Sequence, residues 1–412
     1  MDLETLVRDE VMPEPFAFTP SHFSRHAYQL ESSIIRDILK FSSQPGVISF
    51  AGGLPAPELF PVDEIKSAAD RVLTKYGSAA LQYGLSMGFL PLREFIAERI
   101  FRQTGYRLTA ENILITAGSQ QGLDAVGRAF IERGDYVVCE RPTYVGAMQA
   151  FNYYGTRYAL VEMDDEGMLV ETIDPLITRY RPRLIYVVPN FQNPTGITLS
   201  ESRRRLLVEK ARRYSVPIID DNPYGELRYS GTPAPSIKSL GGQAVLQLGT
   251  FSKIVSPGLR IGWIACSRQI TPVLERVKQC TDLHTNQFAQ HVIYEYAHDG
   301  SLERHIESLI GAYRQRRDAM LRAMSEFFPD TVTWTRPEGG LFLWVRLPEG
   351  TDATELLQKA IEEKVAYVPG RPFFPDGTGL NTLRLNFSNA SLENIHEGIK
   401  RLGRVFSNEA QD

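Results

Sequence analysis

The stretch of sequence that decides the fold lies at residues 245–265 and reads VLQLGTFSKIVSPGLRIGWIA. Its two ends, Val245–Leu248 and Ile261–Ala265, are short apolar runs rich in β-branched residues, and each predicts a buried strand. Lys253 lies in the loop after the first strand. A lysine taken alone is usually exposed to solvent. Because parallel sheets bind ligands at the carboxyl ends of their strands, Lys253 is nevertheless a candidate functional residue.

Similar apolar runs recur earlier in the chain, at Ile113–Thr116, Tyr136–Cys139, Leu184–Val188 and Val216–Asp220. Helical stretches separate several of these runs, for example Gln121–Glu132 and Ser200–Tyr214. Continuous apolar strands that alternate with helices are typical of a mostly parallel sheet covered on both faces. The sequence therefore predicts an α/β fold.

The two ends of the chain show a different pattern. Ser32–Lys40 predicts a short helix, and Val332–Leu347 predicts a hairpin around two adjacent glycines. A final strand, Leu383–Phe387, precedes a last helix that begins near Ser391. We therefore expect a large domain at residues 60–285 and a smaller α+β domain. The smaller domain would combine the C-terminal residues 286–412 with part of an N-terminal arm at residues 1–59.

Composition favours a packed globular protein, since 43% of the 412 residues are hydrophobic. The formal net charge of −4 offers no overall attraction for nucleic acid or an acidic membrane. Two basic clusters, Arg203–Arg205 and Arg314–Arg317, predict solvated helix faces. An odd number of cysteines and an N-terminus without the apolar core of a signal peptide predict a cytoplasmic protein. With the net charge, the sequence predicts neither a nucleic-acid partner nor a membrane partner.

The loop around Lys253 carries groups that suit a phosphate. The hydroxyls of Thr250 and Ser252 and the guanidinium of Arg260 could converge on one phosphate group. Earlier in the chain, the strand that ends at Thr116 runs into AGSQQG, residues 117–122, which opens a helix. The free amides at such a helix start bind anions, although a glycine there is more often only part of a turn.

Polar groups also follow other predicted strands. Asn193 lies in PNFQNPTG, residues 189–196, while Asp221 and Tyr224 lie in DDNPY, residues 220–224. Taken singly, these motifs are usually a turn and a helix cap. Together, an acid, an amide and a phenol match the needs of a protonated pyridine ring with an adjacent phenolate. Tyr144, in ERPTY, is either a ring that stacks on this heterocycle or a buried loop tyrosine.

With these motifs in place, the chain resembles the fold-type-I aminotransferases of class I/II. It is most similar to the 2-aminoadipate, kynurenine and aromatic aminotransferase group, and motifs from Ser33 to Asn389 carry the match. The resemblance implies a mostly parallel seven-stranded sheet in the large domain. It also implies pyridoxal 5'-phosphate as the cofactor, bound by Lys253 as a Schiff base.

The resemblance assigns roles to the motif residues. Asp221 would pair with the pyridine nitrogen, Asn193 and Tyr224 would bind the ring oxygen, and Tyr144 would stack on the ring. The phosphate would be held by Ser119, Gln120, Thr250, Ser252 and Arg260. Tyr83, in LQYG, would reach the phosphate of a neighbouring subunit, which implies a homodimer with shared active sites.

Substrate contacts are implied in the same way. Arg384 would grip the α-carboxylate in a two-pronged contact, together with Asn193, and the backbone of Gly53 would approach the substrate. Arg36 would read a distal carboxylate of an acidic donor. Without the resemblance, Arg384 reads as the exposed face of an alternating strand, and Arg36 as a solvated helix arginine.

The expected reaction is transamination of an L-amino acid, such as 2-aminoadipate, leucine or an aromatic amino acid. The expected acceptor is 2-oxoglutarate, and the kinetics should be ping-pong. Two alternatives remain: a lyase, racemase or synthase on the same scaffold, and an aminotransferase-like sensor domain of a transcription regulator. No metal is expected, since His284, His291 and His298 recur every seven residues, which places them about 10 Å apart along a helix.

Overall fold

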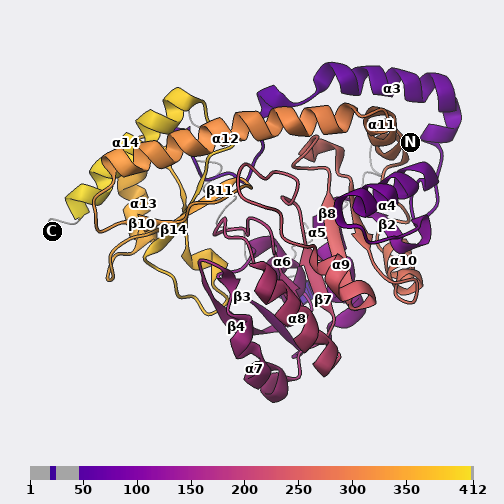
Figure 1. The fold of residues 1–412 in the computed structure, drawn as a ribbon, viewed down its shortest axis with the longest axis horizontal. Coiled ribbons are helices and arrows are strands. Elements are labelled where there is room, and N and C mark those ends of the chain that lie inside the picture. Colours follow the sequence, from indigo (N-terminus) through magenta and orange to yellow (C-terminus); the bar gives the residue numbers. More distant parts are fainter. Residues whose placement is uncertain (1–18, 25–45, 410–412) are drawn as a thin grey trace, which may run out of the picture.

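The computed structural model describes residues 19–24 and 46–409 of the chain (Figure 1). Its centre is an eight-stranded sheet, called the large sheet below, with the order β2-β9-β8-β7-β6-β3-β4-β5. Neighbouring strands from β8 to β4 run parallel, whereas β9 is antiparallel to both of its neighbours. The strand bounds are β2 Ile113–Thr116, β3 Tyr136–Arg141, β4 Arg157–Asp164, β5 Gly167–Met168, β6 Leu184–Val187, β7 Ile218–Asp221, β8 Val245–Thr250 and β9 Gly262–Ala265.

The predicted mostly parallel α/β sheet is confirmed, with two differences. The sequence did not point to β4, whose residues alternate between buried and partly exposed instead of forming one apolar run. This pattern follows from the position of β4 near the edge of the sheet. The expected seven strands become eight because the two-residue strand β5 pairs antiparallel with the end of β4.

Helices cover both faces of the large sheet, which explains why β6 and β7 are buried throughout. On one face, α5 and α6 pack against the strands in one apolar cluster, and on the other face α7 and α8 form a second cluster. The helices of this part are α3 Val62–Tyr76, α4 Leu90–Thr104, α5 Ser119–Phe130, α6 Val145–Asn152, α7 Ile173–Tyr180, α8 Glu201–Tyr214, α9 Ile237–Gly241 and α10 Thr271–Gln279.

A four-stranded sheet, called the small sheet, has the order β10-β11-β14-β13. Its strands are β10 Thr333–Trp334, β11 Phe342–Arg346, β13 Val368–Pro369 and β14 Thr382–Asn386. The predicted hairpin is confirmed as the antiparallel pair β10–β11, and the predicted last strand is β14. The helices α12 Ser301–Phe327, α13 Ala353–Glu362 and α14 Leu392–Glu409 lie in this part of the chain, whereas α11 Gln287–Ala297 lies beside α3 and α4 at the other end of the molecule (Figure 1).

An early and a late segment of the chain pair with each other beside the small sheet. Strand β1, Ile48–Ser49, pairs parallel with β12, Val365–Ala366, although more than 300 residues separate them. The backbone amide of Asn386 also donates to the carbonyl of Phe50. The predicted helix at residues 32–40 lies outside the described residues, and the domain boundaries at residues 59/60 and 285/286 stay a prediction.

The prediction of solvated faces for the two arginine clusters is wrong at Arg203, Arg204 and Arg317, which are buried. Arg204 is only 1% exposed, and its guanidinium donates to the carbonyl of Pro189 and to Oδ1 of Asn190, both at 2.7 Å. A guanidinium can be buried when acceptors of fixed geometry surround its fork of N–H groups. Arg204 thereby anchors the loop that leads from β6 to the site.

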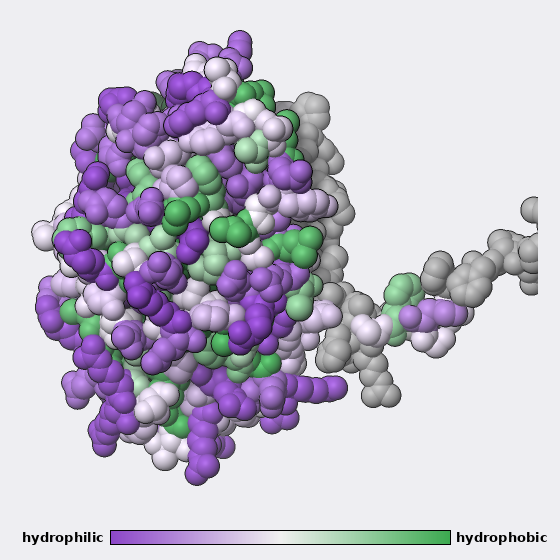
Figure 2. All heavy atoms as spheres, turned by 90° about the vertical axis from the view of Figure 1, so that its right-hand side faces the viewer, coloured by the Kyte–Doolittle hydropathy of each residue, from purple (hydrophilic) through white to green (hydrophobic). Residues whose placement is uncertain are grey.

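Large apolar side chains are exposed on the segment that joins α3 to α4, namely Leu81, Tyr83 and Leu85, and at Leu90, the first residue of α4. These helices lie at the right of Figure 1, and Figure 2 shows hydrophobic side chains grouped near the middle of that face among hydrophilic ones. Within the described residues, no helix is long and apolar enough to cross a membrane.

Candidate active site

A cavity of about 560 Å³ lies at the carboxyl edge of the large sheet. Residues that follow five different strands line it, because the ends of parallel strands meet along one edge. Of the predicted site residues that the structure describes, all except Tyr83 line this cavity: Gly53, Ser119, Gln120, Tyr144, Asn193, Asp221, Tyr224, Thr250, Ser252, Lys253, Arg260 and Arg384. Residues far apart in the sequence are thus brought together as the resemblance implied.

Lys253 lies in the turn that follows β8, and its Nζ donates to the carbonyl oxygen of Gly53 at 2.9 Å. Burial, together with the nearby charges of Arg384 and Arg260, lowers the pKa of Lys253 to about 8. A larger share of this amine is therefore unprotonated near neutral pH than for an ordinary lysine. An unprotonated amine is the form that attacks a carbonyl carbon.

The start of α5 and the loop after β8 form an anion cradle. Gly118 precedes the helix with φ of 76°, and a Cβ at this position would lie 2.6 Å from Nη2 of Arg260. Only glycine therefore allows the guanidinium to approach the helix start so closely. The hydroxyls of Thr250 and Ser252 lie 2.9 Å apart on the same cavity wall. Helix amides, two hydroxyls and one guanidinium suit a phosphate group.

Asp221 ends β7 and is almost completely buried. Its Oδ2 accepts a hydrogen bond from the hydroxyl of Tyr186 at 2.8 Å, whereas its Oδ1 has no hydrogen-bond partner among the described residues. Burial raises the pKa of Asp221 to about 7, the Tyr186 hydrogen bond lowers it, and the charge of Asp220 raises it. Asp220 points to the opposite face of the sheet, where it accepts from Gln247.

Arg384 projects from β14 of the small sheet into the same cavity. The prediction from its sequence alone, an exposed strand face, is wrong, because its exposed fraction is 3%. Its Nη1 donates to Oδ1 of Asn193 and its Nη2 to the carbonyl of Ala51, both at 2.8 Å, while Nε has no partner among the described residues. Burial lowers the pKa of this guanidinium to about 10.

Two phenols complete the cavity. Burial and the charge of Asp221 raise the pKa of Tyr144 to about 12, so its hydroxyl stays protonated at neutral pH. Burial also raises the pKa of Tyr224, and a hydrogen bond with the Asn193 side chain opposes this shift. The amide and the two phenols thus lie around the space between Lys253 and Asp221.

The cavity also contains residues that the sequence reasoning missed: Leu54, Val145, Gly146, Gln149, Val188, Pro223 and Pro257. Leu54, Val145 and Pro223 are adjacent in sequence to a predicted residue, and that adjacency was the available signal. Gln149 lies farther from a motif, on α6, and the helical spacing from Val145 is four residues. The Gln120 side chain links the two helix starts by donating to the carbonyl of Gly146 at 2.8 Å.

Tyr83 does not line the cavity. Tyr83 is 78% exposed, and its ring lies edge-on to the ring of His284 at 5.7 Å. Arg36 lies outside the described residues, so its role stays a prediction. Of the three spaced histidines, His284 precedes α11 instead of belonging to it, and His291 is buried and stacked on Phe89.

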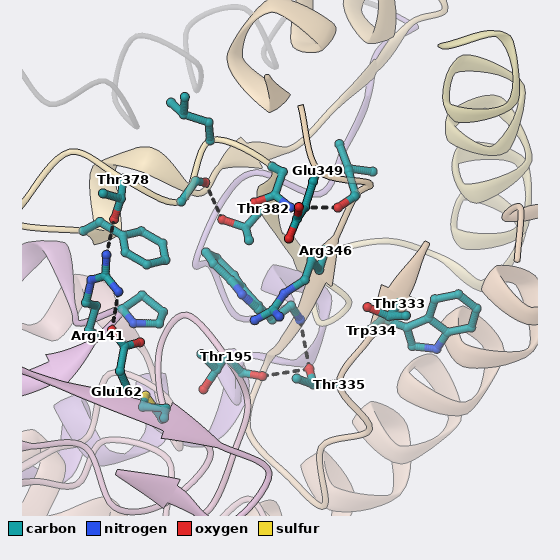
Figure 3. Close-up of a pocket in the computed structure, with 18 of the residues that line it drawn as sticks. Arg141, Glu162, Thr195, Thr333, Trp334, Thr335, Arg346, Glu349, Thr378 and Thr382 are labelled. Atoms are coloured by element: carbon teal, nitrogen blue, oxygen red, sulfur yellow. Dashed lines mark hydrogen bonds and ion pairs between the residues drawn. The ribbon is translucent and has the colours of Figure 1, made fainter. Parts of the chain in front are cut away.

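A second cavity, of about 910 Å³, lies between the large and small sheets (Figure 3). Arg141 at one side pairs with Glu162 and also donates to Asp376 at 2.9 Å. On the other side, the Thr335 hydroxyl donates to the carbonyl of Thr195 at 2.8 Å. No lysine, histidine or cysteine among the described residues lines it. The second cavity is larger, but Lys253 lines the first.

The first cavity fits pyridoxal phosphate group by group. Lys253 offers an amine for the aldehyde, the cradle at Gly118 offers donors for the phosphate, and the unpartnered Oδ1 of Asp221 offers an acceptor for the ring nitrogen. These groups at the carboxyl edge of a mostly parallel sheet define a pyridoxal-phosphate-dependent enzyme of fold type I.

The chain belongs to the aminotransferase class I and II family, whose sequence profile matches residues 46–402. It is 45% identical to aromatic-amino-acid aminotransferase 1 of Thermococcus litoralis, over 99% of both chains. The solved structure of a kynurenine aminotransferase from Pyrococcus horikoshii matches with a TM-score of 0.91 and 44% identity, over 94% of this chain and 98% of that one.

A further solved structure bears on the cofactor. LysN, an α-aminoadipate aminotransferase from Thermus thermophilus, was solved with N-(5'-phosphopyridoxyl)-L-leucine; it matches with a TM-score of 0.88 and 40% identity, over 95% of this chain and 98% of that one. The predicted family, fold type and cofactor are confirmed. The chain is an aminotransferase, its cofactor is pyridoxal 5'-phosphate, and its reaction is transamination.

Proposed function

We propose that this aminotransferase uses an aromatic or long-chain L-amino acid, such as 2-aminoadipate, leucine or kynurenine, as amino donor and 2-oxoglutarate as acceptor. One observation carries the assignment of residues: Lys253, Asp221 and Arg384 face one cavity of about 560 Å³. The substrates named for its relatives, aromatic amino acids, kynurenine and α-aminoadipate, support the donor class.

Each residue has one task in the proposed mechanism. Arg384 binds the α-carboxylate, whose oxygens replace the present acceptors of its two Nη groups. The amide nitrogen of Asn193, which Arg384 does not engage, would donate to the ring oxygen of the cofactor, beside Tyr224. Asp221 holds a proton on the ring nitrogen. Bound pyridoxal phosphate supplies the electron sink that stabilises a carbanion at the substrate α-carbon.

Lys253 carries the proton. With pyridoxal phosphate bound, the free amine of Lys253 would be the base that takes the α-proton of the substrate and the acid that gives a proton back. Its lowered pKa, about 8, suits a group that must both take and release a proton near neutral pH. The same groups then serve the 2-oxo acid in reverse order, which gives ping-pong kinetics.

The test uses Lys253→Met with Lys238→Met as a matched control. Lys238 is also buried with a pKa lowered to about 8, but it donates to backbone carbonyls and does not line the cavity. We expect Lys253→Met to lose the visible absorbance of the bound Schiff base and at least about 1,000-fold in kcat. Lys238→Met should keep both. Unchanged absorbance and turnover in Lys253→Met would refute the assignment.

A donor panel tests the substrate class. Glutamate should form from 2-oxoglutarate with acidic, aromatic and branched donors, whereas a lyase or racemase would form none. Arg36→Ala should lose activity with 2-aminoadipate more than with leucine, because it would remove a partner of the distal carboxylate. Equal losses for both donors would count against this role of Arg36.

We also propose a homodimer in which Tyr83 reaches the cofactor phosphate of the partner subunit. The exposure of Tyr83 beside Leu81 and Leu85 supports an interface on this face (Figure 2). Mixing Tyr83→Ala with Lys253→Met should restore activity, to about a quarter of the wild-type value if subunits exchange randomly. No restoration after verified exchange would contradict a shared site.

The cytoplasmic location stays part of the proposal. The three cysteines Cys139, Cys266 and Cys280 are all free thiols, as a reducing compartment leaves them.

A further inference from the structure

Tyr186 lies inside a strand and does not line the cavity, yet it contacts the site. In the parallel pair β6–β7, Tyr186 is in register with Ile219. Side chains alternate along a strand, so Asp221, two residues beyond Ile219, lies on the same face as Tyr186. The exposed fractions of Tyr186 and Asp221 are 1% and 2%, and the tyrosine hydroxyl donates to Oδ2 of Asp221 at 2.8 Å.

The two carboxylate oxygens of Asp221 differ in their surroundings. Oδ2 has the Tyr186 hydroxyl, whereas Oδ1 is buried without a partner among the described residues. A hydrogen bond to one oxygen restricts rotation of the carboxylate and leaves the other oxygen at a defined place. We propose that Tyr186 is a positioning residue that fixes Asp221 so that Oδ1 meets the ring nitrogen of the cofactor.

The charges around Asp221 make this hydroxyl important. The groups that interact with Asp221 are Glu140 on β3, Asp220 on β7, and the phenols Tyr144 and Tyr224 from the loops. Glu140 and Asp220 are acids, and the two phenols are neutral at neutral pH, so none of the four supplies a positive charge.

Against these neighbours, the Tyr186 hydrogen bond favours the ionised carboxylate and lowers the pKa of Asp221. Burial, Asp221 itself and other nearby acids keep the pKa of Tyr186 well above its usual range, so the tyrosine remains a donor.

Loss of the hydroxyl should therefore weaken the site in two ways. The carboxylate becomes free to rotate, and its pKa rises, so that more of the chain without cofactor carries a neutral Asp221. A neutral acid is a poor partner for a protonated ring nitrogen. This inference rests on the role proposed above for Asp221.

The test titrates pyridoxal phosphate into cofactor-free Tyr186→Phe, followed by protein fluorescence, between pH 6 and pH 9. A hydrogen bond to a charged group is worth at least about tenfold in affinity, so we expect a dissociation constant about ten times the wild-type value at pH 7. The deficit should shrink toward pH 9 as Asp221 ionises. Comparison with wild type at each pH cancels the titration of Lys253.

Tyr367→Phe is the matched control. Tyr367 is also fully buried, and its hydroxyl donates to the carbonyl of Ala353 at 2.7 Å, away from the cavity. Both variants should lose thermal stability, but only Tyr186→Phe should lose affinity. A purely structural role for Tyr186 predicts an unchanged dissociation constant at every pH, and this result would overturn the inference.

Asp221→Asn separates the two proposals. It should bind pyridoxal phosphate weakly at every pH, because an amide cannot ionise. If Asp221→Asn binds like wild type, the role of Asp221 is wrong, and the inference about Tyr186 fails with it. If Asp221→Asn binds weakly while Tyr186→Phe binds normally, only the positioning role of Tyr186 is refuted.

Discussion

Asp221 should destabilise the cofactor-free chain, and the size of this effect follows from its pKa. The group has a pKa of about 7 in the folded chain and an ordinary value of 3.8. Below pH 3.8 the acid is protonated in both the folded and the unfolded chain, so its ionisation does not lower the free energy of unfolding. As the pH rises to 7, the unfolded chain ionises first, so stability falls. Above pH 7 the penalty is complete, at about 4 kcal/mol, since one pKa unit corresponds to about 1.4 kcal/mol.

Asp221→Asn removes this penalty. Its amide oxygen can still accept from Tyr186, but its NH₂ group is left buried without an acceptor, which costs about 1–3 kcal/mol. The cofactor-free variant should therefore be more stable than wild type at pH 8, by about 2 kcal/mol. At pH 4, where the penalty of wild type has nearly vanished, the variant should be the less stable protein.

The assay is urea unfolding of both cofactor-free proteins at pH 4, 6 and 8, followed by circular dichroism. Saturating pyridoxal phosphate at pH 8 should reverse the order, because it stabilises wild type more than the variant. Asp164→Asn is the control of opposite sign: a hydrogen bond from Arg203 lowers the pKa of Asp164, so this variant should lose stability at pH 8. If Asp221→Asn is less stable than wild type at every pH, the reasoning is refuted.

Three further perturbations have defined outcomes. Gln192→Leu removes an amide that donates to the Pro142 carbonyl and accepts from the turn after Asn193. We expect the free energy of unfolding to fall by about 2–4 kcal/mol and kcat/KM to fall about 100-fold. A normal kcat/KM in the folded variant would contradict this. Gly118→Ala forces a methyl group against Arg260, so cofactor affinity measured by titration should fall at least about tenfold, and unchanged affinity would disprove the cradle. Asp376→Asn weakens the hydrogen bond that Arg141 donates to Asp376 between the two sheets, so we expect a changed KM with little change in melting temperature. A lower melting temperature with an unchanged KM would show that this contact has no part in catalysis.

Much of the site was predictable from the sequence because its residues follow strands. A short apolar run predicts a buried strand, and the residue types just beyond it predict what faces the ligand edge. This reasoning placed Lys253, Asp221 and Asn193 correctly at one cavity. It also preferred Asp221 to its neighbour Asp220 by the resemblance, and the alternation of side chains along β7 gives the physical reason.

Other features depended on which segments meet in space. Arg204 appears in the sequence as one of three adjacent basic residues, and its burial is made possible by acceptors from several loops, among them the carbonyls of Pro189 and Pro235. Tyr186 reads as one more residue of a buried strand, because its partner lies on the next strand and 35 residues away. The extent of β4 was also hidden, since a strand near the sheet edge lacks a continuous apolar run.

The sequence by itself determined the α/β class, and the family resemblance of its motifs pointed to Lys253 and the residues around it as a cofactor site. These depend on local rules, namely strand periodicity and the residue types at strand ends. Only the tertiary structure decided that Arg384 from the small sheet meets Asn193, that Oδ1 of Asp221 has no partner in the described part of the chain, and that Lys253 contacts Gly53. The physical reason is that hydrogen bonding and burial depend on strand register and on the contact between the two sheets, which no single segment encodes.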